Sequence, residues 1–264
     1  MSRETKDEKS REGLAYYWPS ILLTLSILVV WEIAIRVRWI NPIYLASPMG
    51  AAEAFWELVR TGEIWEHAGI SFFRIGAGLA LGAVSGIGVG ILTGGYTPIR
   101  RSFEPLINAL YGAPKIALLP LFILLMGIGE LTKVVIIASS TFFSFWINTH
   151  AGMQNIDDLL VRVARNFGAS EMQVLRKVKV RAILPYIFVG FRLSVGQALV
   201  LVIAAEFLAA KSGLGYLIDA ARESFQLERL ISLIFLFGGL SFALNRSILF
   251  VEEKLSPWKE RRSR

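Results

Sequence analysis

The chain has 264 residues, of which 54% are hydrophobic, and its mean hydropathy is +0.54. A soluble domain is nearer to about 45–50% apolar, so this composition indicates a membrane protein. Cysteine is absent and histidine occurs only at His67 and His150, which excludes a disulfide framework and a thiolate metal site and argues against a histidine metal site. The formal charge of +7 comes without a nucleic-acid recognition motif, so it indicates basic cytoplasmic loops and no nucleic-acid partner.

Residues 1–17 carry charges of both signs and no small-residue cleavage site, so we expect a disordered or surface-lying cytoplasmic tail and not a cleaved signal peptide. Six apolar segments follow, each close to the roughly 20 residues that cross a hydrocarbon core. They lie at about residues 18–35, 71–92, 106–127, 131–147, 185–208 and 230–251. The sequence therefore predicts an all-α membrane protein, with a six-helix transmembrane domain over residues 18–251 and a basic cytoplasmic tail over residues 252–264.

The third apolar segment is interrupted by the sequence YGAPK, in which Pro114 and Lys115 break the run. It forms either one broken span or an interfacial helix followed by a short span. The basic residues support six crossings, because 18 of the 28 lysines and arginines fall in segments that this layout places inside and six fall in segments that it places outside. Cytoplasmic loops of membrane proteins concentrate positive charge, so both termini are expected in the cytoplasm.

The second span carries a glycine at every fourth position. The repeated residues are Gly78, Gly82, Gly86, Gly90 and Gly94. In a helix this spacing builds one face without side chains, which lets a neighbouring backbone approach closely. Ordinary helix packing and a glycine-lined face of a pore both fit this pattern.

Residues 148–184 form a charged insert between the fourth and fifth spans. Asp157 and Asp158 favour the start of a helix, and Gly168 suits the left-handed position that ends one. Ser170 then predicts the N-cap of a second helix, with Gln173 completing a capping box. Each helix carries an apolar stripe. The stripes comprise Leu160, Val163, Ala164 and Phe167 in the first helix and Met172, Leu175 and Val178 in the second.

Pro185 marks the start of the fifth span, because proline is tolerated in the first turn of a helix. An insert that exposes apolar stripes and basic residues suits the docking of a partner protein, and it suits equally an amphipathic helix on anionic lipid. The dipeptide Gly-Lys does not occur in the chain, so no phosphate-binding P-loop is available. If ATP drives transport, its hydrolysis must take place on another chain.

Within the insert, Arg162, Val163 and Ala164 are followed by Gly168 and then by residues 178–181. This spacing resembles the signature of the inner-membrane permease subunits of ABC importers, which reads E-A-A, three residues, glycine, nine residues, I-x-L-P. Arg162 stands in place of the acid, and Arg181 in place of the proline. Stretches such as WINPIYLASPMGAAEAFWEL, IALLPLFILLMGIGELTKV and SGLGYLIDAARESFQ also resemble, in the same order, the permeases of the sulfonate, nitrate and taurine importer group. The resemblance covers about residues 18–250.

This resemblance implies the type I fold of ABC importer permeases, in the inner membrane of a prokaryote, with no catalytic activity and no cofactor of its own. The implied partners are a second permease copy, two cytoplasmic ATP-binding subunits, an extracytoplasmic solute-binding protein and membrane lipid. The first helix of the insert would be the coupling helix that binds the ATPase. The residues expected to couple are Arg162, Val163, Ala164, Phe167, Gly168, Ala169 and Ser170.

Few ionisable residues lie within the spans, and Glu206 stands out near the outer end of the fifth. We expect Glu206 and Gln197 to line or gate the translocation path. A pair with a neighbouring helix is the alternative for Glu206. The solute is expected to be a small anion such as a sulfonate, taurine, nitrate or bicarbonate. A thiamine-precursor pyrimidine or riboflavin is the alternative, and an independent secondary transporter or channel is the alternative to an ABC permease.

Overall fold

The protein is represented by a computed structural model that describes residues 4–41 and 43–255, with side chains from residue 18 onward. These residues form helices and no strand, which confirms the all-α prediction. In chain order the elements are α1 (Glu4–Arg36), α2 (Pro48–Arg60), α3 (Glu63–Gly95), α4 (Thr97–Tyr111), the 3-10 helix η1 (Lys115–Leu118), α5 (Leu119–Met126), α6 (Glu130–Gln154), α7 (Asp158–Asn166), α8 (Glu171–Gln173), the π-helix η2 (Val174–Lys179), α9 (Val180–Ala209), α10 (Leu214–Glu223) and α11 (Leu227–Leu255).

Five of the described helical segments are long and apolar enough to cross a membrane, and a sixth crossing results when α4 is taken together with η1 and α5. The five are Trp18–Arg36, Glu63–Gly95, Glu130–Gln154, Glu171–Ala209 and Leu227–Leu255. The axes of α4 and of the following segment differ by 89°. This bend lies at the predicted break, where Pro114 precedes η1 and disfavours a continuous helix. A third crossing built from these segments is therefore sharply bent.

The ends of the chain differ in part from the predicted tails. Helix α1 begins at Glu4, so residues 4–17 continue the helix of the first span. Hydropathy identifies only the part of a helix that can lie in lipid, and the charged turns before Trp18 therefore escape it. In the predicted C-terminal tail, residues 252–255 form the last turn of α11, and residues 256–264 lie outside the described residues.

Helices α3 and α6 make the most extensive contact among the described elements, and the glycine stripe lies in it. Gly78 lies against Ile137, Gly86 against Phe145 and Gly90 against Thr149, so the two helices run in the same direction. A Cβ atom added at Gly86 would lie 2.5 Å from the carbonyl oxygen of Phe142, which is closer than such atoms can approach. The stripe is thus a helix-packing surface, as the first of the two interpretations of the glycine pattern predicts.

The fifth crossing does not start at Pro185. Helical structure is unbroken from Glu171 to Ala209, and Pro185 lies inside α9. A proline removes one backbone donor and crowds the carbonyl four residues earlier, but one such residue need not end a long helix whose other hydrogen bonds are made. The second helix of the insert and the fifth span are therefore one continuous segment.

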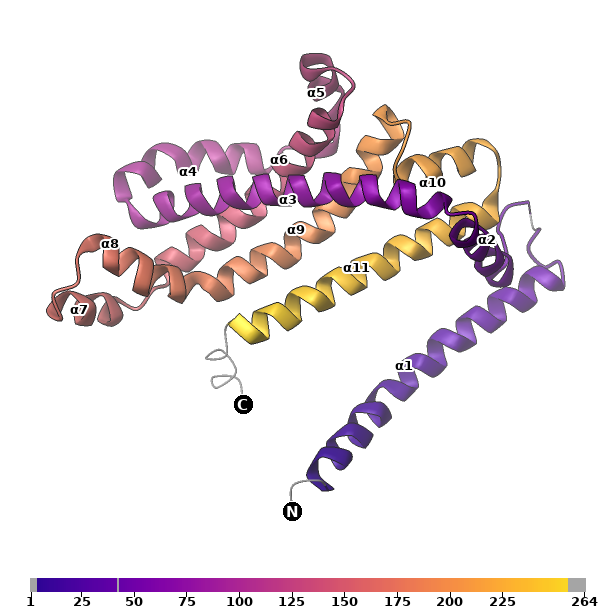
Figure 1. Cartoon of the computed structure of the whole chain (residues 1–264), viewed down its shortest axis with the longest axis horizontal. Helices are drawn as coiled ribbons and strands as arrows, with labels where there is room; N and C mark the ends of the chain where they lie inside the picture. The colour runs from indigo at the N-terminus through magenta and orange to yellow at the C-terminus, as the bar shows by residue number, and fades with distance from the viewer. Residues whose placement is uncertain (1–3, 42, 256–264) are drawn as a thin grey trace.

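Short helices lie at both ends of the molecule. α2 and α10 lie at the opposite end from α7 and α8, as Figure 1 shows. α2 packs against α11, while α1 contacts chiefly α2 and otherwise runs apart from the remaining helices (Figure 1). The carboxylate of Glu32 in α1 accepts a hydrogen bond of 3.0 Å from the backbone N–H of Met49 at the start of α2.

Candidate functional site

Helix α7 of the insert is fixed at both ends by local hydrogen bonds. The Asp157 carboxylate accepts from the backbone N–H of Leu159 at 2.8 Å, which caps the N-terminus as the acidic residues predict. At the C-terminus Gly168 has φ +79°. The N–H groups of Gly168 and Ala169 donate to the carbonyls of Arg165 and Ala164, which is the Schellman arrangement. The predicted helix and its glycine stop are therefore confirmed.

The apolar stripe of α7 faces away from the rest of the chain. Val161 is the buried residue of this helix, whereas the predicted stripe residues are largely open, with Phe167 88% exposed. Leu160 and Val163 are exposed as well, and Ala164 is half-buried. Exposed apolar side chains on a short capped helix indicate a contact surface for another molecule.

The turn after α7 is stiffened by its own side chains. Ser170 and Gln173 form the predicted capping box, because Ser170 Oγ accepts from the Gln173 N–H and Gln173 Oε1 accepts from the Ser170 N–H at 2.8 Å. Arg165 of α7 pairs with Glu171 of α8 at 2.8 Å. Arg162 is exposed, so its side chain is available to a partner. The residues predicted to couple thus lie together on one small, ordered protrusion.

Glu206 is only 1% exposed and is surrounded by donors from α3 and α10. Its carboxylate accepts from Ser71 Oγ at 2.7 Å, from Arg74 Nη1 at 2.7 Å and from the Gly215 N–H at 2.7 Å. Arg74, also 1% exposed, binds Glu130 of α6 through two parallel hydrogen bonds of 2.6 and 2.7 Å. The structure therefore places Glu206 in an ionic cluster between helices, which is the second of its two predicted roles.

The same face of α3 holds the start of α10. His67 Nδ1 accepts from the Gly213 N–H at 2.9 Å, and Ser71 Oγ accepts from the Leu214 N–H at 2.8 Å. The Gly215 N–H donates in the same way to Glu206. Three consecutive N–H groups at the start of α10, which cannot bond within the helix, thus have acceptors. His67, Ser71 and Arg74 are spaced by four and three residues, so they lie on one face of α3.

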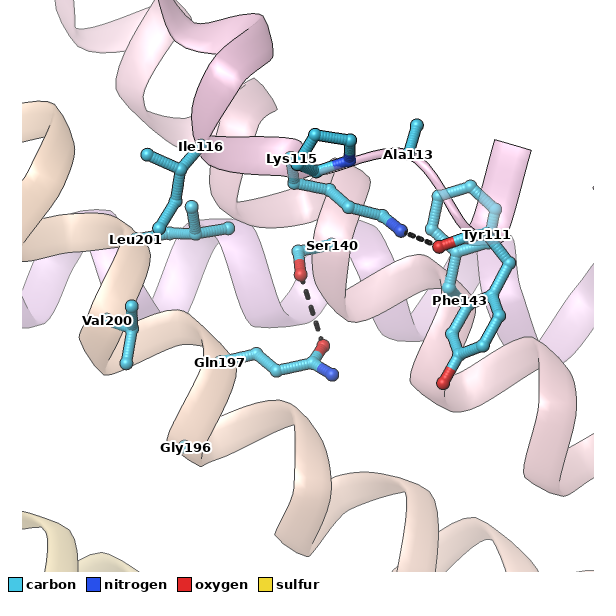
Figure 2. Close-up of a pocket in the computed structure, with 11 residues that line it drawn as sticks. Tyr111, Ala113, Lys115, Ile116, Ser140, Phe143, Gly196, Gln197, Val200 and Leu201 are labelled. Atoms are coloured by element: carbon cyan, nitrogen blue, oxygen red, sulfur yellow. Dashed lines mark hydrogen bonds between the residues drawn. The ribbon is translucent and has the colours of Figure 1, made fainter. Parts of the chain in front are cut away.

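Gln197, the other predicted path residue, lies at a pocket of about 410 Å³. The pocket lies between the break after α4, the middle of α6 and the middle of α9 (Figure 2). Gln197 Oε1 accepts hydrogen bonds from Ser140 Oγ at 3.1 Å and from Ser144 Oγ at 2.9 Å. The structure therefore does not bring Gln197 and Glu206 into one site in this conformation.

Several residues of these sites escape sequence reasoning. Lys115, which faces Gln197 across the pocket, is visible in the sequence only as part of the break in the third span. Phe143 and Ser140 belong to an apolar run without any special pattern. The pairing of Arg74 with Glu206 joins residues 132 positions apart, so no local signal indicates it.

Comparison with known proteins matches residues 86–257 to the family described as binding-protein-dependent transport system inner membrane component. The chain is 36% identical over 236 residues to the Escherichia coli (strain K12) protein named aliphatic sulfonates transport permease protein SsuC, covering 89% of this chain and 90% of that protein. It is 30% identical to the taurine transport system permease protein TauC of the same organism, covering 98% of both chains.

The fold also has a solved counterpart. A chain from an inward-facing structure of the MetNI methionine ABC transporter superposes with a TM-score of 0.63 at 18% identity, covering 76% of this chain and 97% of that chain. This likeness shows the type I permease fold, and the apolar helices with the sequence relatives indicate a multi-pass protein of the inner membrane. The chain belongs to the family of inner-membrane components of binding-protein-dependent transport systems, and it is a transport permease subunit.

Proposed function

We propose that two copies of this chain form the membrane path of an ATP-driven importer. Two cytoplasmic ATP-binding subunits drive it, and an extracytoplasmic binding protein delivers the solute. In this arrangement both termini and the insert with α7 lie in the cytoplasm. The carrying observation is α7 itself, a capped helix whose apolar stripe is exposed and ends in Phe167.

The relatives favour a small organic anion as the solute. Two relatives, at 36% and 30% identity over most of the chain, are named for aliphatic sulfonates and for taurine. This supports a sulfonate, taurine or a similar anion over a thiamine-precursor pyrimidine or riboflavin. Nitrate and bicarbonate remain within the proposed class of small anions.

An independent carrier is the second candidate, and the ionic cluster argues against it. A proton-coupled carrier needs titratable groups along its path. In the described part of the chain, Arg74 and Glu206 instead neutralise each other in a buried cluster. ATP-independent uptake by the purified chain alone in liposomes would support the carrier, and its absence supports the importer.

The proposed docking is tested by removing the aromatic ring of Phe167. An exposed aromatic residue that anchors an interface contributes about 2 kcal/mol or more to binding. Phe167→Ser should therefore reduce the amount of ATPase that co-purifies with the permease, and solute uptake with it. Membrane insertion should not change, because the Phe167 side chain is exposed.

Phe225 supplies the matched control, because it is 86% exposed at the opposite end of the molecule. Phe225→Ser should leave ATPase co-purification at the wild-type level. If Phe167→Ser retains the ATPase and full uptake, α7 is not the docking helix. A lipid-bound role of α7 would then gain support if the variant releases the insert from anionic vesicles.

A further inference from the structure

The pocket beside Gln197 lies at mid-depth in the membrane-spanning part of the chain. Ser140, which lines it, is ten residues from the first residue of α6 and fourteen residues from the last, Gln154. At about 1.5 Å per residue the pocket is roughly 15 Å from one end of α6 and about 21 Å from the other. Its volume of about 410 Å³ falls in the range of roughly 300–1,000 Å³ that small-molecule sites occupy.

Lys115 brings a positive charge to this pocket. Its ammonium group lies 4.5 Å from the ring centroid of Phe143 and 5.0 Å from that of Tyr111, and it donates to the Tyr111 carbonyl oxygen. Figure 2 shows the lysine side chain reaching over the space in which Gln197 lies. The bend between α4 and η1 places the charge there, because Lys115 is the first residue of η1.

Two other cations in the spans, Arg74 and Lys133, are paired with carboxylates. Arg74 faces Glu206 at 2.7 Å, and Lys133 faces Glu130 at 3.0 Å. Lys115 has no ion-pair partner among the residues that the structure describes. An ammonium group at membrane depth without a counter-charge is costly, and such residues usually face a functional cavity. A bound anion would supply the missing charge.

Gln197 presents a second donor to the same space. Its Oε1 atom is occupied by Ser140 and Ser144, which leaves the Nε2 hydrogens directed into the pocket and without a partner in the described part of the chain. Most of the remaining wall is apolar and includes Ile116, Val200 and Leu201. One cation, one amide donor and apolar walls fit a small monoanion that carries a short hydrocarbon part.

We propose that Lys115 and Gln197 form an intramembrane binding subsite for the anionic group of the transported solute, with a small organic sulfonate as its ligand. This subsite rests on the proposed importer function and locates the solute within it. Lys115 makes the charge-assisted hydrogen bond, Gln197 donates the second bond, and the aliphatic walls contact the hydrocarbon part. A single cation suits a transport path, because a site on such a path must also release its ligand.

The experiment uses the complete transporter, reconstituted in liposomes with its ATP-binding subunits and its binding protein. Uptake of radiolabelled ethanesulfonate and of taurine is measured for wild type, Lys115→Met, Lys115→Arg and the control Lys254→Met, which removes an exposed lysine at the end of α11. Lys115→Met should lower uptake about tenfold or more, the factor expected for a lost hydrogen bond to a charged group. Lys115→Arg and Lys254→Met should stay near wild type. ATPase stimulation by loaded binding protein should persist in all variants.

Gln197→Glu separates ligand binding from a structural role. The substitution keeps the size of the side chain but places a carboxylate opposite Lys115, where it competes with the solute anion. Uptake should fall about tenfold, while the thermal midpoint of the detergent-purified complex should be unchanged or higher. A structural role alone would leave uptake intact or lower the midpoint.

Wild-type uptake in Lys115→Met or in Gln197→Glu would overturn the subsite. So would a wild-type complex that hydrolyses ATP in response to its binding protein but carries neither ethanesulfonate nor taurine. Neither result would touch the importer function, which the Phe167 variants test separately. Loss of uptake in Phe167→Ser together with normal uptake in Lys115→Met would leave the importer in place and remove the subsite alone.

Discussion

At the scale of single residues, the end of the molecule with α2 and α10 depends on one buried ion pair. Arg74 and Glu206 are both about 1% exposed, and every oxygen of the Glu206 carboxylate has a donor. Removing Arg74 would leave Glu206 as an uncompensated charge in an apolar surrounding, which is more costly than removing both, whereas removing Glu206 leaves Arg74 paired with Glu130. The cluster also holds the amides at the start of α10, so it positions a surface turn as well as three helices.

Arg74→Met should therefore destabilise the protein by about 3–5 kcal/mol, the usual cost of breaking a buried pair. Thermal unfolding in detergent measures this loss. Glu66→Ala provides the control, because Glu66 is exposed near the same end of α3. The double variant Arg74→Met with Glu206→Met should lose less stability than Arg74→Met alone.

The gating role predicted for Glu206 has its own test. Glu206→Gln keeps an acceptor for the Gly215 N–H but removes the charge that faces Arg74. If Glu206 only holds the cluster together, Glu206→Gln should lower the thermal midpoint and leave uptake by the folded protein unchanged. A variant with normal stability and altered uptake would establish the gate instead.

The sequence leaves both roles of Glu206 open, and physical reasons explain why. The choice depends on whether Arg74 lies on a neighbouring helix at the same depth, and this is a matter of tertiary packing. Lys115 presents the same difficulty, since its significance depends on the absence of a carboxylate from three surrounding segments. Nine residues separate Gln197 from Glu206, which is about two and a half helical turns, so the two side chains lie on opposite faces of α9. Neighbouring helices bury Glu206, and Gln197 lies at a pocket.

At the scale of elements, α3 and α6 form the closest-packed pair. Five glycines of α3 allow its backbone to lie directly against α6. Van der Waals contact of this kind drives helix association in lipid, where no hydrophobic effect operates between helices. The contact should therefore be sensitive to a single methyl group.

Gly86→Ala and Gly88→Ala test this with a matched pair from one helix. A Cβ at Gly86 would meet Phe142 and Phe145 of α6, whereas nothing lies within 4 Å of a Cβ at Gly88. Gly86→Ala should destabilise the protein by about 1–3 kcal/mol, the usual cost of overpacking. Gly88→Ala should be neutral or slightly stabilising, because alanine is the better helix former. Equal midpoints in detergent for the two variants would contradict the packing account.

Elements defined by local signals are the ones that the sequence predicts well. The stop at Gly168 and the capping box at Ser170 depend on residues within one or two turns, and both are found as predicted. The 89° bend after α4 is different, because a proline and a glycine predict a break but not its angle. The continuation of α9 through Pro185 likewise depends on helical bonding that extends beyond any single residue.

At the scale of the whole molecule, the short helices lie in two groups at opposite ends. α7 and α8 lie at one end, and α2 and α10 lie at the other (Figure 1). The positive-inside pattern predicts that the α7 end is cytoplasmic. The chain has no cysteine, which makes this orientation easy to test.

Single cysteines at two exposed lysines should report opposite sides of the membrane. Lys177→Cys lies in η2 beside the insert, and Lys211→Cys lies between α9 and α10. A membrane-impermeant maleimide should label Lys211→Cys in intact spheroplasts and should label Lys177→Cys only after the membrane is opened. The reverse pattern would place α7 outside and remove its proposed contact with an ATPase.

The α3–α6 contact has a mechanical consequence for the whole chain. Because the two backbones touch from Gly78 to Gly94, neither helix can slide or turn without the other. One end of this pair adjoins the insert, and the other end carries the Arg74–Glu130 bond, so the two ends must be displaced together. Relative movement then falls to segments that touch the pair sparsely, and η1 is one of them. Lys115 lies in η1, which can move, whereas Ser140 and Phe143 lie in α6, which is held against α3. Each conformational cycle would therefore change the width of the pocket between them.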